Sequence, residues 1–557
     1  MKKTVALFSL LFLFACNKKK AYDTIIRNGM IYDGNGGEPY KADIGIINDT
    51  IAFIGDLGKA SGTNETDAGG MAVAPGFINM MGHSEEALIQ DGRSQSDIRQ
   101  GVTSEIFGEF SMGPLNPKMK EQLQKGQSDI KYKVEWNTLG EYMNFLEKKG
   151  ISCNIASFVG TGIVRQYVIG EDNKAPSPAQ LDSMKLLVGQ AMEQGALGVT
   201  NALIYPPDFF AKTDELIALS KVASQYGGCY SSHMRSEGNK LLEAVEELIT
   251  ISKEAHIPAE IFHLKAAGKN NWGKMDSVIR RVERAREEGQ QVTADMYTYV
   301  AGATGMTSAF PPSLQDGGFG KLWQRLQDPG IRAEMQKAMN TDAADWENLY
   351  YGAGGAEHVL LLGFKQDSLK KYTGKTLAEV AKLRKKSPEE TAMDLIVQDS
   401  TRVGVAYFLM SEENVKKQVP VSWVSFGSDE ASYTPEGVFL KSNAHPRAYG
   451  NFARVIGKYS RDEKILSLPE AIRKLSKLPA VNLKLKNRGE LRTGYYADIV
   501  IFDPAKVKDN ATFEKPHQYS EGMLHVFVNG VQVLKDGEHT GTMPGKFVKG
   551  PGYKNEK

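Results

Sequence analysis

The sequence predicts an α/β fold in which a (β/α)8 TIM barrel is joined to a small β-sandwich domain built from both ends of the chain. In the middle of the chain, three short apolar runs alternate with helical patterns and end at His233, His263 and Asp295. Near both termini, short alternating segments predict strands with no helices between them. At 557 residues, the chain is long enough for a barrel with insertions and a further domain.

The three apolar runs have the spacing of repeated βα units. Thirty residues separate His233 from His263, and 32 separate His263 from Asp295. Such an interval holds one strand, one helix and two loops. Apolar residues recur at helical spacing between the runs, at Leu241, Leu242, Val245, Leu248 and Ile249, and again at Met275, Val278, Ile279 and Val282. Because the C-terminal strand ends of such a barrel carry its chemistry, both histidines are expected to point into one mouth.

Residues 1–20 resemble a bacterial lipoprotein signal and anchor region. Lys2 and Lys3 precede an apolar run that is too short to span a bilayer comfortably, and the run ends in Leu13-Phe14-Ala15-Cys16. We therefore expect Cys16 to be lipidated and to hold the protein to a membrane of the bacterial cell envelope, facing the periplasm or the surface. An ordinary cleaved secretory signal is the alternative.

Composition argues weakly against some partners. The formal net charge is +1, which argues against nucleic acid. Besides Cys16, only Cys153 and Cys229 are present, too few for a disulfide framework. Nothing in the sequence predicts the oligomeric state.

Residues 21–73 and 481–557 are predicted to form the β domain. TIIRNGMIYD is expected to turn at Asn28-Gly29, and ADIGIINDTIAFIGD to form two strands joined at Asn48-Asp49. ADIVIFDP and MLHVFVNGVQVLKDG repeat the pattern near the C-terminus. Residues 74–480 are assigned to the barrel. An inserted segment at about 309–357 is expected to act as a lid or as a structural bracket.

Two more barrel strands are predicted near the start of the barrel. APGFINMMGHSEE contains the first, with His83 shortly after it. Val102 to Phe107 form the second, which ends at Gly108-Glu109. A carboxylate at such a strand end is either a metal ligand or a solvated loop charge.

Several long, ordered motifs are spread over about residues 23–540. They include GALGVTNALIYPPDFF, YSSHMRSEGNK, IFHLKAAGKNNWGK, DMYTY, FGSDE, HPRAYGNFARVIGKY and GYYADIVIFDP. Together they give the chain a resemblance to the D-aminoacylase family, the N-acyl-D-amino-acid deacylases of the amidohydrolase superfamily. It implies a zinc-dependent hydrolase that cleaves the amide bond of N-acyl-D-amino acids to a carboxylate and a free D-amino acid.

The chain departs from the superfamily at the first barrel strand, whose usual form is P-G-F-I-D-x-H-x-H. Asn79 replaces the acid, Met81 replaces the first histidine, and only His83 remains. Methionine is a poor zinc ligand, so that metal position is expected to be weak or empty. His83 is assigned as a weak ligand, with a pocket-lining histidine as the alternative.

The resemblance implies one tightly bound zinc per chain. His233 and His263 match the two histidine ligands of the family. Family members often carry a cysteine after the second strand, and Glu109 takes that place here. A carboxylate oxygen can replace a thiolate on zinc, so Glu109 is assigned as the third ligand, with Glu105 or water as alternatives.

The resemblance also assigns a proton carrier and a substrate clamp. Asp429 matches the aspartate that takes a proton from water and passes it to the leaving amine, although a helix N-cap is an alternative. The substrate is expected to be a small molecule bearing a carboxylate, which Lys265, Tyr297 and Arg447 would hold. Structural roles are the alternatives for these three.

Two other functions stay open. The chain could be an amidohydrolase that acts on a cyclic amide or an unusual dipeptide. It could also be a non-catalytic, surface-anchored protein with a decayed site, a reading that Asn79 and Met81 support. Intact His233, His263 and Asp429 argue against the second of these.

Overall fold

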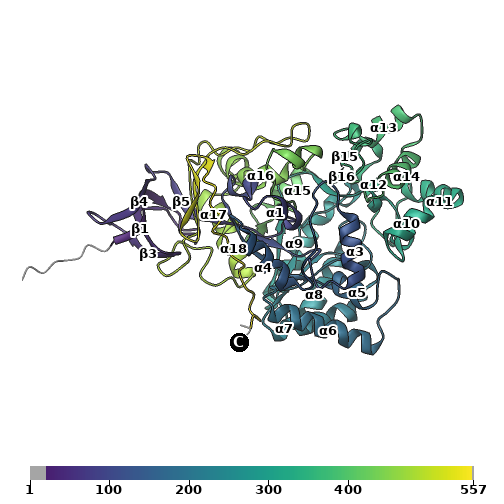
Figure 1. Cartoon of the computed structure of the whole chain (residues 1–557), viewed down its shortest axis with the longest axis horizontal. Helices are drawn as coiled ribbons and strands as arrows, with labels where there is room; N and C mark the ends of the chain where they lie inside the picture. Colours follow the sequence, from purple (N-terminus) through teal and green to yellow (C-terminus); the bar gives the residue numbers. More distant parts are fainter. Residues whose placement is uncertain (1–20, 555–557) are drawn as a thin grey trace, which may run out of the picture.

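The computed structural model describes residues 21–554. These residues form a mixed α/β protein in which two parallel sheets occupy the centre and a third, larger sheet collects strands from both ends of the chain (Figure 1). The predicted signal and Cys16 lie outside the described residues. Within residues 21–554, no helix combines the length and the apolar character needed to cross a membrane.

The central strands run parallel in two sheets. The larger sheet has the order β17-β13-β12-β11-β10-β9, with bounds β9 (Val159–Gly160), β10 (Gly198–Ala202), β11 (Cys229–His233), β12 (Ala259–Ile261), β13 (Val292–Met296) and β17 (Val424–Phe426). The smaller sheet has the order β6-β7-β8, with bounds β6 (Phe77–Asn79), β7 (Val102–Phe107) and β8 (Asn154–Ser157). Backbone hydrogen bonds join the two sheets at both edges. The Met80 amide donates to the Phe426 carbonyl at 3.2 Å, and the Leu197 amide donates to the Ser157 carbonyl at 2.9 Å.

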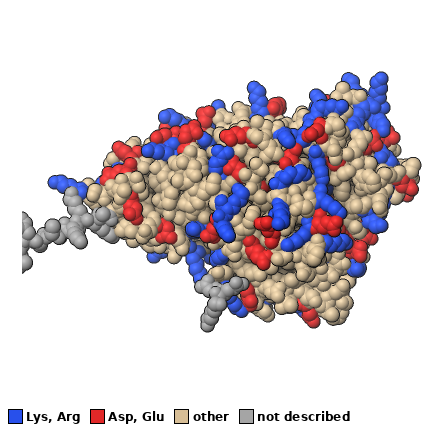
Figure 2. Space-filling view, in the orientation of Figure 1, with Lys and Arg blue, Asp and Glu red and all other residues tan. Residues whose placement is uncertain are grey.

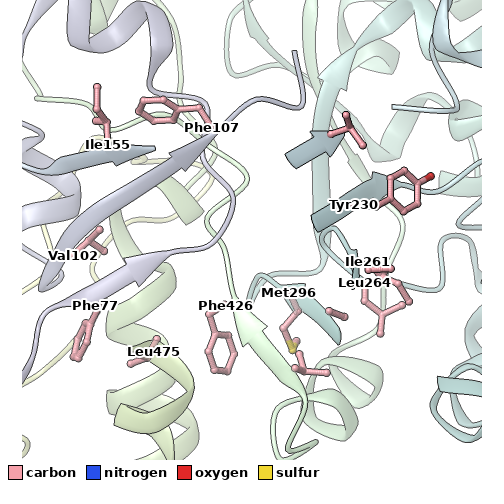
Figure 3. Close-up of a cluster of buried hydrophobic side chains, with 14 of the residues drawn as sticks. Phe77, Val102, Phe107, Ile155, Tyr230, Ile261, Leu264, Met296, Phe426 and Leu475 are labelled. Carbon is pink, nitrogen blue, oxygen red and sulfur yellow. The ribbon is translucent and has the colours of Figure 1, made fainter. Parts of the chain in front are cut away.

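Helices separate the parallel strands, as the apolar periodicity predicts. α8 (Leu241–Ala255) follows β11, and α9 (Met275–Glu287) follows β12. The predicted apolar stripes of both helices face inward, and Val245 and Val278 are fully buried. One apolar core joins both sheets to their helices, and Figure 3 shows Phe426 of β17 beside Leu475 of α17 (Leu468–Leu475) within it.

The other helices of this region have the bounds α1 (Glu85–Gln90), α2 (Gln95–Ile98), α3 (Pro117–Gly126), α4 (Leu139–Lys149), α5 (Thr161–Val168), α6 (Pro178–Glu193), α7 (Thr213–Gln225), α15 (Glu412–Gln418), α16 (Arg447–Arg454) and α18 (Lys477–Asn482). Pro178 at the first helical position and the Ser177 capping box show how the sequence starts α6.

Strands from both termini share one nine-stranded sheet. Its order is β21-β20-β19-β18-β5-β1-β2-β3, and β4 also pairs with β1. The bounds are β1 (Ala21–Ile31), β2 (Tyr40–Ile47), β3 (Thr50–Gly55), β4 (Ser61–Asp67), β5 (Ala72–Pro75), β18 (Ile499–Phe502), β19 (Met523–Val528), β20 (Val531–Lys535) and β21 (Glu538–His539). The two ends of the chain meet where β5 pairs antiparallel with β18.

One predicted turn in this sheet is confirmed and one is wrong. β2 and β3 form a hairpin at Asn48-Asp49. The chain does not turn at Asn28-Gly29, because β1 continues through it and only its register with β2 shifts. Asn28 takes a left-handed φ of 55° as part of a bulge. Its backbone amide donates to Asp43 and its side-chain amide to Asp67, and these bonds hold the bulge.

A separate lobe lies between β13 and β17 in the sequence, at the upper right of Figure 1. It has a three-stranded antiparallel sheet of order β14-β16-β15, with bounds β14 (Ala301–Gly305), β15 (Val359–Gly363) and β16 (Gly404–Phe408). Its helices are α10 (Phe319–Arg325), α11 (Pro329–Met339), α12 (Leu349–Ala353), α13 (Leu377–Arg384) and α14 (Pro388–Asp399). The lobe packs around its own apolar core, and residues 309–357 lie inside it.

Candidate active site

Three of the predicted ligands meet at the ends of parallel strands. His233 ends β11, His263 follows β12, and Glu109 follows β7. Glu109 Oε1 lies 3.1 Å from His233 Nδ1 and 3.7 Å from His263 Nε2. The two imidazole rings are 4.5 Å apart, and one ligand atom from each of the three residues lies within 4.8 Å of the others. We call Glu109, His233 and His263 the inner group.

A second group shares Glu109 with the first. His83 Nε2 lies 3.4 Å from Glu109 Oε2 and 3.1 Å from Asp429 Oδ1. We call His83, Glu109 and Asp429 the outer group. Glu109 therefore presents one oxygen to each group, the arrangement of a carboxylate placed between two cation positions.

The inner group fits a metal ion. Its side chains are all almost fully buried, and His233 Nε2 is a buried nitrogen without a hydrogen-bond partner among the described residues. An unsatisfied polar atom at this depth is unfavourable unless something binds nearby. Two imidazoles and one carboxylate are also a donor set that zinc accepts.

The charges of the site also favour a bound metal cation. Burial opposes ionisation of Glu109, but hydrogen bonds from His233 and His263 outweigh it and lower its pKa to about 2. Burial also opposes charge on His83, but Asp429 and Glu109 outweigh it and raise its pKa to about 9. Protons on His83 and His263 thus compensate the buried carboxylates. A metal cation would compensate them in the same way once those protons leave.

Two site residues have strained backbones. His263 has a φ of 36° and Asp429 a φ of 50°, which non-glycine residues rarely adopt. The His263 amide donates to Asp295 Oδ1 at 3.1 Å, and the Asp429 amide donates to the Met81 carbonyl at 2.9 Å. Asp295 and Met81 therefore hold the strained residues in place. The Met81 side chain packs in an apolar cluster instead of facing the site.

Asn79 also supports the loop that carries Asp429. Its carbonyl oxygen accepts from the Ser428 amide at 2.9 Å, and its side-chain amide donates to Ser428 Oγ at 2.8 Å and Asp97 Oδ2 at 3.1 Å. An aspartate in its place would have no N–H for Asp97. This gives a structural reason for asparagine at a position where the superfamily usually has an acid.

The three predicted substrate-binding residues lie beside the site, and the two cations among them, Arg447 and Lys265, already have acidic partners. Arg447 Nη1 is 2.8 Å from Asp429 Oδ2, and its guanidinium lies 4.3 Å from the centre of the Tyr297 ring. Lys265 Nζ is 2.5 Å from Glu237 Oε1. The Tyr297 hydroxyl is buried and makes no hydrogen bond within residues 21–554.

Sequence reasoning missed Glu237 and Tyr205. Glu237 is buried, and its Oε1 lies 3.0 Å from His263 Nδ1. Glu237 lies four residues after His233, within YSSHMRSE, and this nearness to a predicted ligand could have identified it. The Tyr205 ring lies 5.3 Å from the His233 ring. Glu105, the alternative third ligand, belongs to neither group, and burial raises its pKa.

A cavity of about 1270 Å³ opens onto the site. His83, Asp429 and Arg447 line one end, and residues 303–305 and 402–405 of the lobe line another part. In Figure 2, lysine and arginine side chains gather across the middle of this face, in the area that α3 occupies in Figure 1. The cavity is therefore large enough for a small substrate, and both basic and acidic side chains line it.

Comparisons with known proteins agree with this geometry. The model of the Amidohydrolase family matches residues 64–534. The D-aminoacylase of Alcaligenes xylosoxydans xylosoxydans is 31% identical over 533 residues, which cover 95% of this chain and 97% of that protein. Both the family model and this relative span almost the whole described chain.

Two solved structures have the same fold. One is a D-aminoacylase described for the role of its binuclear metal centre, with 29% identity, a TM-score of 0.79 and coverage of 95% of this chain and 100% of that one. The other is an N-acyl-D-glutamate deacylase from Bordetella bronchiseptica complexed with zinc and a phosphonate inhibitor, with 26% identity, a TM-score of 0.79 and the same coverage. The chain therefore belongs to the D-aminoacylase family of amidohydrolases.

Proposed function

We propose that this protein is a zinc-dependent hydrolase that cleaves the amide bond of N-acyl-D-amino acids to a carboxylate and a free D-amino acid. One observation carries the proposal. Glu109, His233 and His263 form a buried metal-binding geometry beside Asp429, in a chain 31% identical to a D-aminoacylase over 95% of its length. The preference for the D configuration comes from the relatives alone.

Zinc has one favoured place in this proposal. The inner group would hold a single tight zinc, and the outer group would be a weaker position. When bound, zinc would polarise the acyl carbonyl and make water a better nucleophile near neutral pH.

Asp429 is suited to move the proton. Burial opposes its charge, but Arg447, His263 and His83 outweigh burial and hold the pKa of Asp429 far below its usual value. The carboxylate is therefore ionised, which a proton acceptor requires, but so low a pKa makes it a weak base as long as His83 and His263 carry protons. The same carboxyl group can then protonate the leaving nitrogen, so that the free amine departs.

Lys265, Tyr297 and Arg447 would hold the α-carboxylate of the substrate. The unpartnered Tyr297 hydroxyl can donate to it, and two cations lie over the same ring, with Arg447 at 4.3 Å and Lys265 at 5.5 Å from its centre. Positive charge and a free donor thus converge beside Asp429. This clamp would place the scissile amide next to the inner group.

The finer architecture belongs to the same proposal. The hydrogen bonds between Met80 and Phe426, and between Leu197 and Ser157, support one closed (β/α)8 barrel over residues 74–480. The sheet shared by residues 21–73 and 481–557 would form the β-sandwich. Lipidation of Cys16 rests on the sequence, and a Cys16→Ser protein recovered unchanged in the membrane fraction would argue against it.

The function is tested with residues 21–557, purified and loaded with zinc. We expect one zinc per chain by elemental analysis and hydrolysis of N-acetyl-D-amino acids, with little hydrolysis of the L enantiomers. A cyclic amide and an N-acyl amine without a carboxylate serve as comparison substrates. Zinc-loaded protein that hydrolyses only the cyclic amide, or nothing, would rule out the proposed function.

A further inference from the structure

Arg402 lines the same cavity as His83 and Asp429 but belongs neither to the metal-binding groups nor to the clamp for the α-carboxylate. It lies just before β16 of the lobe and is half-buried. Its guanidinium sits 4.9 Å from the centre of the Tyr205 ring, whose other neighbour is His233 at 5.3 Å between ring centres. One aromatic ring therefore separates Arg402 from the inner group.

Neutral groups hold this guanidinium. Arg402 Nε donates to Thr307 Oγ1 at 3.2 Å, and Nη2 donates to Thr304 Oγ1 at 3.5 Å. Thr304 Oγ1 in turn lies 2.8 Å from the Tyr205 hydroxyl. Within residues 21–554, no ion pair joins Arg402 to an acidic side chain, and Nη1 has no hydrogen-bond partner.

The other charges of the cavity differ from Arg402. Arg447 is paired with Asp429, and the Lys365 ammonium donates to the Lys125 carbonyl. Lys118 and Lys321 are exposed, and their ammonium groups make no ion pair or hydrogen bond with other described residues. The acids have donors already, as at Asp129, which is paired with two lysines. Hydrogen bonds to Thr304 and Thr307 thus hold the Arg402 guanidinium in place, but none of the described acidic side chains pairs with it.

The backbone of Gly305 packs directly against the Arg402 side chain, where a larger residue would not fit. A Cβ at Gly305 would lie 2.7 Å from Arg402 Nε and 2.8 Å from Arg402 Cβ, which is closer than packed atoms allow. The other end of the same strand touches the substrate clamp, since a Cβ at Gly302 would lie 3.3 Å from the Tyr297 hydroxyl. Three residues of β-strand cover about 10 Å, so β14 connects the clamp to Arg402 over that distance.

We propose that Arg402 determines specificity by binding a second carboxylate of the substrate, while the clamp holds the α-carboxylate. The inference rests on the proposed deacylase function. The clamp and Arg402 are about 10 Å apart along β14, and a hydrogen bond of about 3 Å is needed at each end. The remaining distance of about 4 Å suits the separation of the two carboxylates in an N-acylated dicarboxylic amino acid. A carboxylate at the far end of a short acyl group would reach Arg402 as well. A guanidinium with a free edge is suited to either.

The test compares acidic substrates with neutral isosteres. One pair is N-acetyl-D-glutamate and N-acetyl-D-glutamine, in which the second charge is on the side chain. The other is N-succinyl-D-alanine and its terminal amide, in which the charge is on the acyl group. Each is assayed with wild type, Arg402→Gln, Arg402→Lys and the control Lys321→Gln, which removes an exposed cation from the same cavity.

We expect wild type to prefer the acid in at least one pair, and the preferred pair identifies which carboxylate Arg402 binds. Arg402→Gln should lower kcat/KM for that acid about 10- to 100-fold, mainly through KM, and change the neutral isostere by less than about threefold. Arg402→Lys should recover part of the loss, and Lys321→Gln should behave as wild type.

Two outcomes would overturn the inference. Arg402→Gln could lose kcat/KM equally on the acid and the neutral substrate while its zinc content and melting temperature stay unchanged. That result would show that Arg402 does not bind the second carboxylate. No preference of wild type in either pair would show the same. Failure of wild type on every member of both pairs would instead reject the proposed function, and the inference with it.

Discussion

The inner and outer groups share Glu109 but differ in burial and in their neighbours. In the inner group, the side chains of His233 and His263 are 7% and 2% exposed, and both lie at the ends of neighbouring parallel strands. In the outer group, the His83 side chain is 28% exposed, and Asp429 already has a cation beside it in Arg447. The inner group therefore combines almost complete burial with neighbouring strand ends, whereas the outer group is more exposed and already contains the ion pair between Asp429 and Arg447.

Removing an inner imidazole tests this contrast with the largest expected effect. His263→Ala should lose tight zinc and activity together, because two ligands cannot hold the ion at nanomolar free zinc. Zinc per chain and kcat/KM are measured on the same sample. His358→Ala, at an exposed histidine of the lobe, is the matched control and should keep both.

The two carboxylates should separate metal binding from proton transfer. Asp429→Asn should keep its zinc and lose about 100- to 10,000-fold in kcat, because an amide cannot accept the proton. Added zinc should not restore it. Glu109→Gln should instead arrive with less zinc and regain part of its activity when zinc is added. The opposite pattern of metal content would reverse the two roles.

The outer histidine should matter less. His83→Asn should retain about one zinc per chain and lose about tenfold in kcat/KM, since it removes one hydrogen bond to Asp429. Metal titration followed by activity gives the comparison with His263→Ala. Loss of the tight zinc in His83→Asn would show that the outer group holds it.

The smallest expected effect concerns the loop beneath the outer group. Burial and the charge of Glu105 raise the pKa of Asp97 well above its usual value, and Asn79→Asp would add a further acid 3.1 Å from it. We expect a loss of about 1–3 kcal/mol in the free energy of unfolding. Because the pKa values of these acids are raised in the folded state, the loss should grow as pH rises from about 5 to 8.

Thermal unfolding at both pH values measures this loss. Asn270→Asp provides the surface comparison, because Asn270 is exposed and its side chain makes no hydrogen bond within residues 21–554. A loss at Asn79 that shrinks as pH rises would contradict the assigned cause. Zinc content should stay near that of wild type, which separates the support of the loop from metal binding.

Local patterns in the sequence determined the strands and helices of the central region. They also placed His233 and His263 at strand ends. The alternation of apolar runs with helical stripes predicts β11, α8, β12, α9 and β13, because periodicity reports which face of an element is buried. Resemblance added Glu109 and Asp429, whose strand ends β7 and β17 lie more than 300 residues apart in the chain.

Only the tertiary structure decided which side chains surround those histidines. Glu237 contacts His263 because the loop after β11 folds back over the neighbouring strand, and Asn28 forms a bulge because Asp43 and Asp67 reach it from other strands. Arg402 enters the cavity because a separate lobe lies beside the site. No local pattern reports such contacts, since they depend on how distant segments pack once the sheets have formed.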